Sequence, residues 1–273
     1  MAMRFLDGLD DDIKKNLLEE LRVLWTYSST TIEGNTLTLG ETAFVLKEGL
    51  TIQGKPLKDH RDVEGHARAV DLLLSLVNKD TFVTQDLFDL HRLVMNEQLL
   101  DVLKPVGDWK KENNSTNVTL ANKQQIMEFS NFWEVPELMT RWLALLNYQV
   151  QMDGEPEDVL SAYARLHISF TTIHPFWDGN GRVARLVSNL PCLKAGYPPI
   201  VIDNGRRYEY LTTLAEHVLA NGVPNRKTEI IHESPSLERF RSFCGECWEK
   251  SQTLVREAHE LQKNRREKAK LFL

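Results

Sequence analysis

The segment HPFWDGNGRVAR, residues His174–Arg185, combines a helix end, a polar loop and a helix start. Apolar residues before it recur at helical spacing as far as Ile173. A residue that precedes proline is disfavoured in the α region, so the His-Pro pair predicts the end of that helix. The DGNG sequence then supplies two glycines that can adopt positive φ and expose backbone N–H groups, and a new helix is predicted from Arg182. The segment therefore predicts an anion-binding loop at a helix N-terminus, a setting that suits phosphate.

The polar side chains of this segment indicate its chemistry. Asp178 would repel phosphate unless a divalent cation bridged the two, and Mg²⁺ is commonly held by one carboxylate together with phosphate oxygens. Arg182 and Arg185 share a helix face and could both reach a polyphosphate. Asn180 adds a neutral amide donor. His174 belongs to the residue type that titrates near neutral pH, so it is predicted to be a general base toward an incoming hydroxyl.

Helical spacing of apolar residues continues on both sides of this segment. Apart from the helix that ends at Ile173, helices are predicted from Ile13 to Leu24, from Thr38, from Val63 to Val77, from Thr84, from Pro136, from Arg182 to Ala195, from Arg207 to Ala220 and from Ser236 to Lys268. The exception lies between Val106 and Phe132, where NVTLA alternates like a short strand and predicts a loop or small hairpin. No internal repeat is present, so the pattern favours a single mainly α domain with appended terminal helices.

Composition and charge exclude several classes of protein. The 273 residues are 42% hydrophobic and 26% charged, as in an ordinary globular domain, and the longest aliphatic runs are too short for a membrane span. A net charge of -6 argues against nonspecific binding of nucleic acid, and the basic cluster KNRREKAK at 263–270 is interpreted as a solvated helix end. The N-terminus shows no secretory leader and only three cysteines are present, so a cytoplasmic location is expected. The CGEC sequence at 244–247 is interpreted as helical thiols rather than a redox or metal motif.

The segment HPFWDGNGRVAR matches in full the signature of the Fic-domain family, His-x-Phe-x-Asp/Glu-Gly-Asn-Gly-Arg-x-x-Arg. The resemblance extends from about Arg61 to Ala220. It implies an all-α fold, a Fic-type helical bundle with a small β-hairpin called the flap. Residues 1–60 would hold N-terminal helices, 61–222 the Fic core and 223–273 a C-terminal helical extension. Most members of the family transfer AMP from ATP to a hydroxyl side chain of a target protein.

The resemblance also implies a role for each signature residue. His174 would deprotonate the target hydroxyl, and Asp178 would hold Mg²⁺ on the α and β phosphates of ATP. Phosphate would be bound by Asn180 and by the amides around Gly179 and Gly181, while Arg182 would contact the β-phosphate and Arg185 the γ-phosphate. Phe176 would insert into the core. Tyr208 would lie near the nucleotide base. Pro191 is expected to kink the helix that follows the loop.

In this family the flap pairs with the backbone of the target and presents its hydroxyl, a form of strand addition. Val118, Thr119 and Leu120 are the residues of suitable character and position for that role. The arginine that usually follows a glycine before the flap is replaced here by Lys110 or Lys111, which leaves the anchoring of the flap open.

The segment SSTTIEGN, residues 28–35, resembles an autoinhibitory motif, Ser/Thr-x-x-x-Glu-Gly/Asn, of some members of the family. It places Ser29, Glu33 and Gly34 at the end of the first predicted helix. In such members the glutamate pairs with the last signature arginine, here Arg185, and blocks the γ-phosphate position. Without the resemblance, Glu33 would be interpreted as an acid in a solvated turn.

Other functions remain open from the sequence alone. The same site could belong to a de-AMPylating phosphodiesterase in which Glu33 orients water, or to a non-catalytic nucleotide-gated regulator. Relatives also use other nucleotides or phosphocholine, so the choice of ATP rests on the family. The expected partners are ATP and a protein hydroxyl, which includes the chain itself, with no nucleic acid and no membrane. A homodimer is left open.

Overall fold

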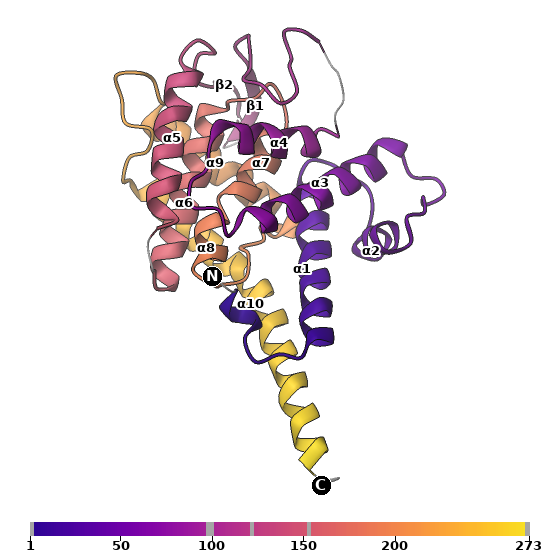
Figure 1. Ribbon diagram of the computed structural model, residues 1–273. Coiled ribbons are helices and arrows are strands. Elements are labelled where there is room, and N and C mark those ends of the chain that lie inside the picture. The colour runs from indigo at the N-terminus through magenta and orange to yellow at the C-terminus, as the bar shows by residue number, and fades with distance from the viewer. Residues whose placement is uncertain (1–2, 97–100, 121–122, 152–153, 271–273) are drawn as a thin grey trace.

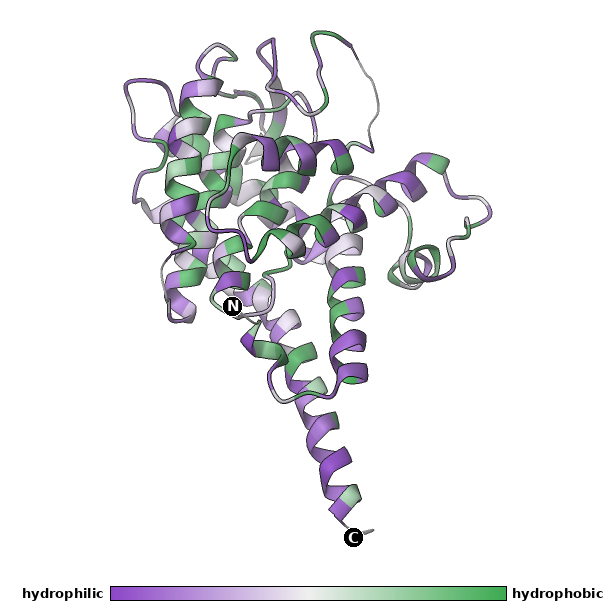
Figure 2. Cartoon of the chain, viewed as in Figure 1, coloured by the Kyte–Doolittle hydropathy of each residue, from purple (hydrophilic) through white to green (hydrophobic). Residues whose placement is uncertain are grey.

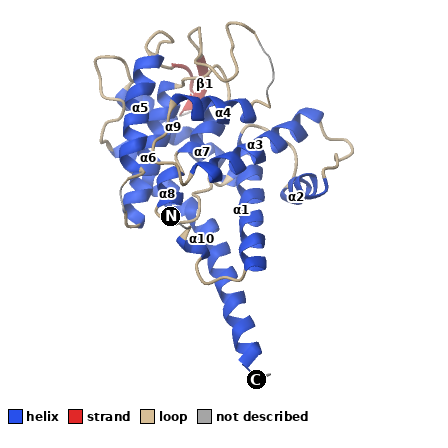
Figure 3. Cartoon of the chain, in the orientation of Figure 1, coloured by secondary structure: helices blue, strands red, loops and turns tan. Residues whose placement is uncertain are grey.

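The computed structural model describes residues 3–96, 101–120, 123–151 and 154–270. Within them the chain is mainly helical, with one two-stranded antiparallel hairpin, as the sequence predicts (Figure 3). The elements in order are a 3₁₀ turn Arg4–Leu6, α1 Asp11–Ile32, α2 Leu39–Glu48, α3 Leu57–Leu76, α4 Thr84–Val94, β1 Ser115–Leu120, β2 Lys123–Glu128, α5 Val135–Gln149, α6 Pro156–Ile173, α7 Asn180–Val187, α8 Leu190–Lys194, a 3₁₀ turn Asn204–Arg206, α9 Arg207–Asn221 and α10 Pro235–Lys270.

The core of the bundle surrounds α6. Trp142 of α5, Phe170 of α6 and Val183 of α7 are fully buried in one apolar cluster, which also receives side chains from α3 and α4. Figure 2 shows hydrophobic segments gathered in the bundle, while the far end of α10 is mainly hydrophilic. Because α6 and α7 are both held in this core, the loop that joins them has fixed ends.

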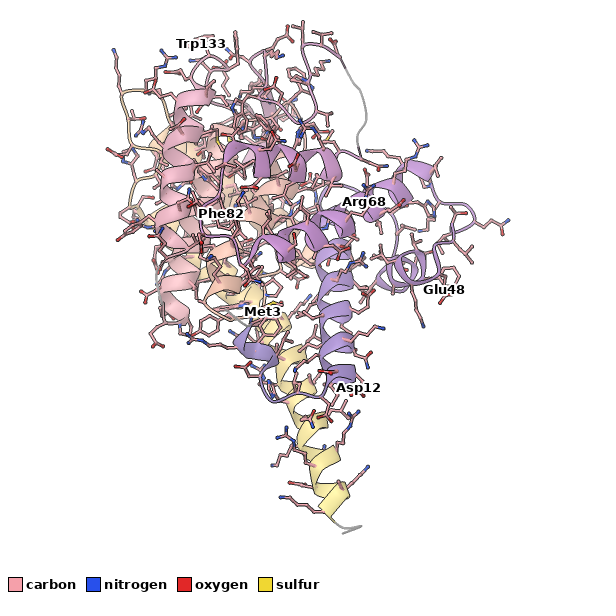
Figure 4. All side chains as sticks on the ribbon, in the orientation of Figure 1. Met3, Asp12, Glu48, Arg68, Phe82 and Trp133 are labelled. Atoms are coloured by element: carbon pink, nitrogen blue, oxygen red, sulfur yellow. The ribbon has the colours of Figure 1, made fainter. Side chains whose placement is uncertain are left out.

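The helices α1 and α10 extend from one end of the bundle, and the hairpin lies at the other end (Figure 1). The N-terminal half of α1 packs its apolar face, including Leu17 and Leu21, against Leu254 and Val255 of α10. Arg265 of α10 also forms ion pairs with Asp10 and Asp12 at the start of α1. Figure 4 shows Asp12 beside α10 at this contact. Arg266 donates to the Gly8 carbonyl, so two arginines of the basic cluster at 263–270 make contacts with the N-terminal segment instead of facing solvent alone.

The helix predicted from Arg182 to Ala195 is not continuous. It ends at Val187, and α8 begins at Leu190. Pro191 has no N–H to donate back to the preceding turn, so the helical hydrogen bonds cannot continue through it. The Asn189 side chain replaces part of that pattern, since its amide donates to the carbonyls of Arg185 and Ile200. The expected kink is therefore a break.

Two further features bear on the predicted organisation. The helix α3 begins at Leu57, so the predicted boundary at residue 60 lies inside a helix, and the division into three parts stays a prediction. Cys244 and Cys247 are buried, free thiols on α10, in agreement with the interpretation of CGEC as helical.

Among the described helices, none combines the length and apolar character needed to cross a membrane.

Candidate active site

The loop between α6 and α7 is folded back on itself by buried hydrogen bonds. The helix α6 ends at Ile173, and the next residue, His174, has a left-handed backbone with φ 54° and ψ 62°. Phe176 is fully buried in the core, as predicted. The Asn180 side chain accepts from the N–H of Phe176 at 2.9 Å and donates to its carbonyl at 2.8 Å. These two bonds close the loop and use the oxygen and one N–H of the Asn180 amide, and its predicted contact with phosphate stays a prediction.

His91 of α4 holds the same loop from outside. Its Nε2 donates to the Asp178 carbonyl at 3.0 Å, its Nδ1 accepts from the Gly107 N–H at 2.9 Å, and its ring stacks on Phe176. Burial lowers the pKa of His91 to about 3, so the imidazole is neutral and can donate from one nitrogen while accepting at the other. His91 therefore fixes the loop in place.

The two glycines of the loop, Gly179 and Gly181, differ in backbone conformation and in their neighbours. Gly179 has φ 77°, in the left-handed region that favours glycine. Gly181 is in the first turn of α7, and a Cβ there would lie 2.8 Å from the Glu33 Oε1. The Glu33 carboxylate therefore lies directly over the N-terminus of α7, where an anion would bind.

His174 presents one ring nitrogen for chemistry. Its Nδ1 lies 3.2 Å from the Thr171 carbonyl, which can only accept, so Nδ1 carries the hydrogen and Nε2 is the unprotonated nitrogen. The ring stacks on Phe129 with centroids 3.6 Å apart. Burial, and next the charge of Lys110, lower the pKa of His174 to about 3. The imidazole is therefore neutral at physiological pH and able to accept a proton.

The predicted pairing of Glu33 with Arg185 is present. Arg185 is almost completely buried, at 2% exposure, and its Nη2 lies 2.5 Å from the Glu33 Oε1. Ser29 completes the contact, since its hydroxyl and its carbonyl each accept from the guanidinium at 3.0 Å. Gly34 follows with φ 96° and allows the chain to turn away after α1. The C-terminal turn of α1 therefore covers the guanidinium.

Tyr210 is a further partner of Arg185 that the sequence did not single out for this role. Its hydroxyl accepts from Arg185 Nη1 at 3.2 Å and lies 3.1 Å from His167 Nε2. Burial opposes the charge on the guanidinium, but Tyr210 and Glu33 raise the pKa of Arg185 above its ordinary value. Arg185 is thus a permanently charged group held from two sides.

Arg182 lies away from Arg185, although both are on α7. Its guanidinium donates to the Val94 carbonyl at 3.1 Å and forms an ion pair with Asp62 at 3.6 Å. It reaches Asp178 only at 3.9 Å, and it does not line the cavity described next. Its predicted contact with phosphate stays a prediction, and the contacts observed here join α7 to α3 and α4.

A cavity of about 970 Å³ opens beside the loop. Most of the site residues predicted from the sequence line this cavity, and they come from four separate parts of the chain. Its lining includes Glu33, Val118, His174, Asp178, Gly179, Asn180, Gly181, Arg185 and Tyr208. Tyr208 is largely exposed at the rim, whereas Tyr210 is buried beneath it.

The hairpin forms the wall of the cavity opposite the loop. Ser115, Thr116 and Asn117 of β1 line the cavity, and β1 pairs with β2 in antiparallel register. Val118 is half-buried against an apolar cluster formed by the hairpin and α9. For Thr119 and Leu120 the structure describes the backbone pairing, and their side chains lie outside the described part. Since the described hairpin has two strands, β1 keeps an edge that is not paired by β2.

Asp178 is the carboxylate available to a metal ion in this cavity. Its side chain is mostly exposed, and one of its oxygens accepts from the Gly179 N–H at 2.6 Å. In the described residues no group of three or more His, Cys, Asp or Glu side chains is placed to hold a metal by itself. A single carboxylate suits Mg²⁺ that phosphate oxygens and water also bind, so the residues fit a cation that arrives with a nucleotide.

Comparison with known proteins places this site in a family. Residues 81–192 match the family model of the Fic/DOC family. The protein adenylyltransferase fic-1 of Caenorhabditis elegans is 29% identical over 232 residues, which make up 83% of this chain and 42% of that protein. The protein adenylyltransferase Fic of Drosophila grimshawi is 32% identical over 186 residues, 67% of this chain and 35% of that protein. The chain thus spans about two fifths of the length of these curated relatives.

Solved structures agree with the fold. The crystal structure of a Fic-domain-containing signaling protein from Bacteroides thetaiotaomicron superposes with a TM-score of 0.80 at 25% identity, over 94% of each chain. Fold and site together define a helical protein in which a loop with two glycines opens a helix beside a neutral histidine. The chain contains a domain of the Fic/DOC family, matched over residues 81–192.

Proposed function

We propose that the protein is an adenylyltransferase that moves AMP from ATP to a Ser, Thr or Tyr hydroxyl of a target protein. The observation that carries the proposal is the position of His174, which has an unprotonated Nε2 and lines one cavity together with residues of the loop and of β1. The names of the curated relatives, protein adenylyltransferases, support the same activity. The proposed setting is the cytoplasm.

The proposed reaction is a single displacement at the α-phosphorus. The target hydroxyl oxygen forms a bond to that phosphorus while its proton passes to His174 Nε2, and the bond to the bridging oxygen of the β-phosphate breaks. Pyrophosphate leaves with the bonding electron pair, and AMP remains on the target. A Mg²⁺ ion, held by Asp178 and by phosphate oxygens, would neutralise charge on the phosphates. The loop amides and Arg185 contribute fixed positive charge, and the unpaired edge of β1 suits an extended segment of the target.

We also propose that Glu33 inhibits this reaction. Its carboxylate lies over Gly181 and pairs with Arg185, so it occupies the position in which a terminal phosphate would meet the guanidinium. The Glu33 side chain remains 43% exposed on the cavity side, so it can move without opening the core. Displacement of Glu33 would release Arg185 for the nucleotide.

A second candidate function uses the same carboxylate. Glu33 lines the cavity together with His174 and Asp178, so it could orient a water molecule toward the phosphorus of an AMP-modified side chain. The transfer and the removal of AMP would then take place in the same site. Glu33 would be required for the removal, although it inhibits the transfer.

The test uses ATP labelled at the α-phosphate. We expect the Glu33→Gly variant to label itself faster than the wild type, by about 5- to 150-fold if the inhibitory contact corresponds to a coupling free energy of ~1–3 kcal/mol. Glu48→Gly is the matched control, because Glu48 also ends a helix and precedes a glycine with positive φ. Figure 4 shows Glu48 on α2, which projects from the side of the molecule.

Three outcomes separate the candidates. Faster labelling by Glu33→Gly, with Glu48→Gly equal to the wild type, supports transfer under inhibition. Release of AMP from a labelled protein by the wild type, lost in Glu33→Gly, supports removal. Neither labelling nor release in any variant, with intact nucleotide binding, would leave the protein as a non-catalytic regulator.

A further inference from the structure

Lys110 lies between the loop and the hairpin, and it is buried in an unusual way. The residue is 2% exposed. No carboxylate of a described residue forms an ion pair with its ammonium, which instead donates to the Asn114 side-chain oxygen at 2.7 Å. Burial lowers the pKa of Lys110 to about 7. A lysine without a charged partner is expensive to bury, so its contacts indicate what it does.

The first contact reaches the beginning of the hairpin. Asn114 immediately precedes β1, and its amide donates to the carbonyls of Phe176 and Trp177, both at 3.2 Å. The Asn114 side chain therefore has its oxygen on Lys110 and its nitrogen on the loop. This places the first residue of β1 at a fixed distance from the loop.

The second contact reaches the end of the hairpin. Phe129 immediately follows β2, and the Lys110 ammonium lies 5.9 Å from the centre of its ring. The ring of Phe129 also stacks on the ring of His174. The third contact is made by the backbone, since the Lys110 N–H donates to the Pro175 carbonyl at 2.8 Å. Lys110 thus touches both flanks of the hairpin and the residue next to His174.

We propose that Lys110 is a positioning residue that fixes the base of the hairpin to the loop carrying His174, and so sets the register between the proposed base and the target segment. Lys111, the neighbouring lysine, has no such contacts: it is half-exposed and pairs with Asp108 at 3.3 Å. Of the two lysines before the hairpin, the inner one alone bridges the two walls of the cavity in the described part of the chain. This inference rests on the proposed transfer reaction, because it assigns the residue a part in that reaction.

The test compares Lys110→Met with Lys111→Met, each combined with Glu33→Gly so that labelling is measurable. Methionine keeps most of the side-chain volume and removes the donor. We expect Lys110→Met to reduce the rate of self-labelling by roughly 10²-fold, the size of effect produced by a misplacement of about 1 Å. ATP binding, measured by calorimetry, should be unchanged, because Lys110 does not line the cavity. Lys111→Met should label like the parent.

Hydrogen exchange provides a readout that a general loss of stability would not reproduce. The backbone amides of β1 and β2 should exchange faster in Lys110→Met, while those of α5 and α6 keep the rates of the parent. Asn114→Ala, which removes the same link from the other end, should give the same pattern. It also keeps the proposal testable if Lys110→Met does not fold.

The outcomes are distinct from those of the proposed function. If the Glu33→Gly parent does not label itself, the transfer reaction is wrong, and hydrogen exchange still reports whether Lys110 anchors the hairpin. If the parent labels itself and both Lys110→Met and Asn114→Ala match Lys111→Met in rate and in exchange, Lys110 has no positioning role. Faster exchange throughout the molecule would also overturn the proposal, because it indicates a general structural role.

Discussion

The two walls of the cavity are built in opposite ways. The loop wall, from His174 to Arg185, is fixed by buried side chains such as Phe176 and Asn180, and Asn180 hydrogen-bonds to the backbone of the loop itself. The hairpin wall has a short pair of strands with exposed polar side chains and a free edge. A fixed wall suits the part of a reaction that never varies, the phosphates, whereas an open edge suits targets that differ in side chain. If the proposed function holds, the chemistry and the selection of targets are carried by separate segments of the chain.

The largest expected effect concerns the fixed wall. In the Glu33→Gly background, His174→Ala should reduce labelling by ~10²–10⁴-fold, because it removes the proposed general base. Nucleotide affinity, measured by calorimetry, should change little. A variant that labels at the parent rate would show that the target hydroxyl loses its proton to another group.

The second effect tests whether Arg182 supports that wall instead of binding nucleotide. Arg182→Met leaves the Asp62 carboxylate without its nearest cation, in a site where burial raises its pKa. We expect a loss of unfolding free energy on the order of 3 kcal/mol, measured by urea denaturation. Asp62→Asn combined with Arg182→Met should recover part of it, because the stranded charge is gone. A stable Arg182→Met protein with weakened ATP binding would instead assign Arg182 to the phosphates.

Much of the loop wall could be predicted from the sequence, but the residues from other segments that hold it in place could not. The loop and the end of α6 before His174 follow from local sequence signals, whereas the pairing of Glu33 with Arg185 is implied only by the resemblance to the Fic family. His91, Tyr210 and Lys110 act from segments far away in the chain, through contacts that leave no periodic signal.

The two arginines of α7 show the same limit. Spacing placed Arg182 and Arg185 on one face, but tertiary contacts direct one toward Asp62 and the other toward Glu33. The break before Pro191 could be foreseen only as a kink, because the role of Asn189 depends on Ile200 lying beside it. Local patterns thus predict elements and motifs, while partners that come from elsewhere in the chain decide how each side chain is used.

The third prediction compares one residue type on the two walls. Asn180→Ala removes both bonds to the Phe176 backbone and leaves buried groups without partners, so it should cost ~1–3 kcal/mol of unfolding free energy. Asn117→Ala, on the exposed strand β1, should change stability by less than about 0.5 kcal/mol. Thermal and urea unfolding of both variants measure the contrast. Equal losses would mean that the hairpin is as tightly built as the loop.

The smallest effect is a pH dependence of the fixed wall. The pKa of His91 is about 3 in the folded protein, because burial disfavours its charge, and ~6.5 when unfolded. The unfolded state therefore binds the extra proton, so stability is present above pH ~6.5 and is lost as the pH falls. At pH 6 the loss from this group is about 1 kcal/mol.

Urea denaturation at pH 7.5 and pH 6.0 measures this loss, and His91→Gln is the variant that isolates it. Other buried histidines, His66 and His167 among them, have lowered pKa values and add losses of the same sign. Glutamine keeps an amide donor for the Asp178 carbonyl but cannot titrate, so the difference between the two pH values should shrink by about 1 kcal/mol. If the wild type and the variant lose the same stability, His91 is not held neutral, and the loop wall is less rigid than its hydrogen bonds indicate.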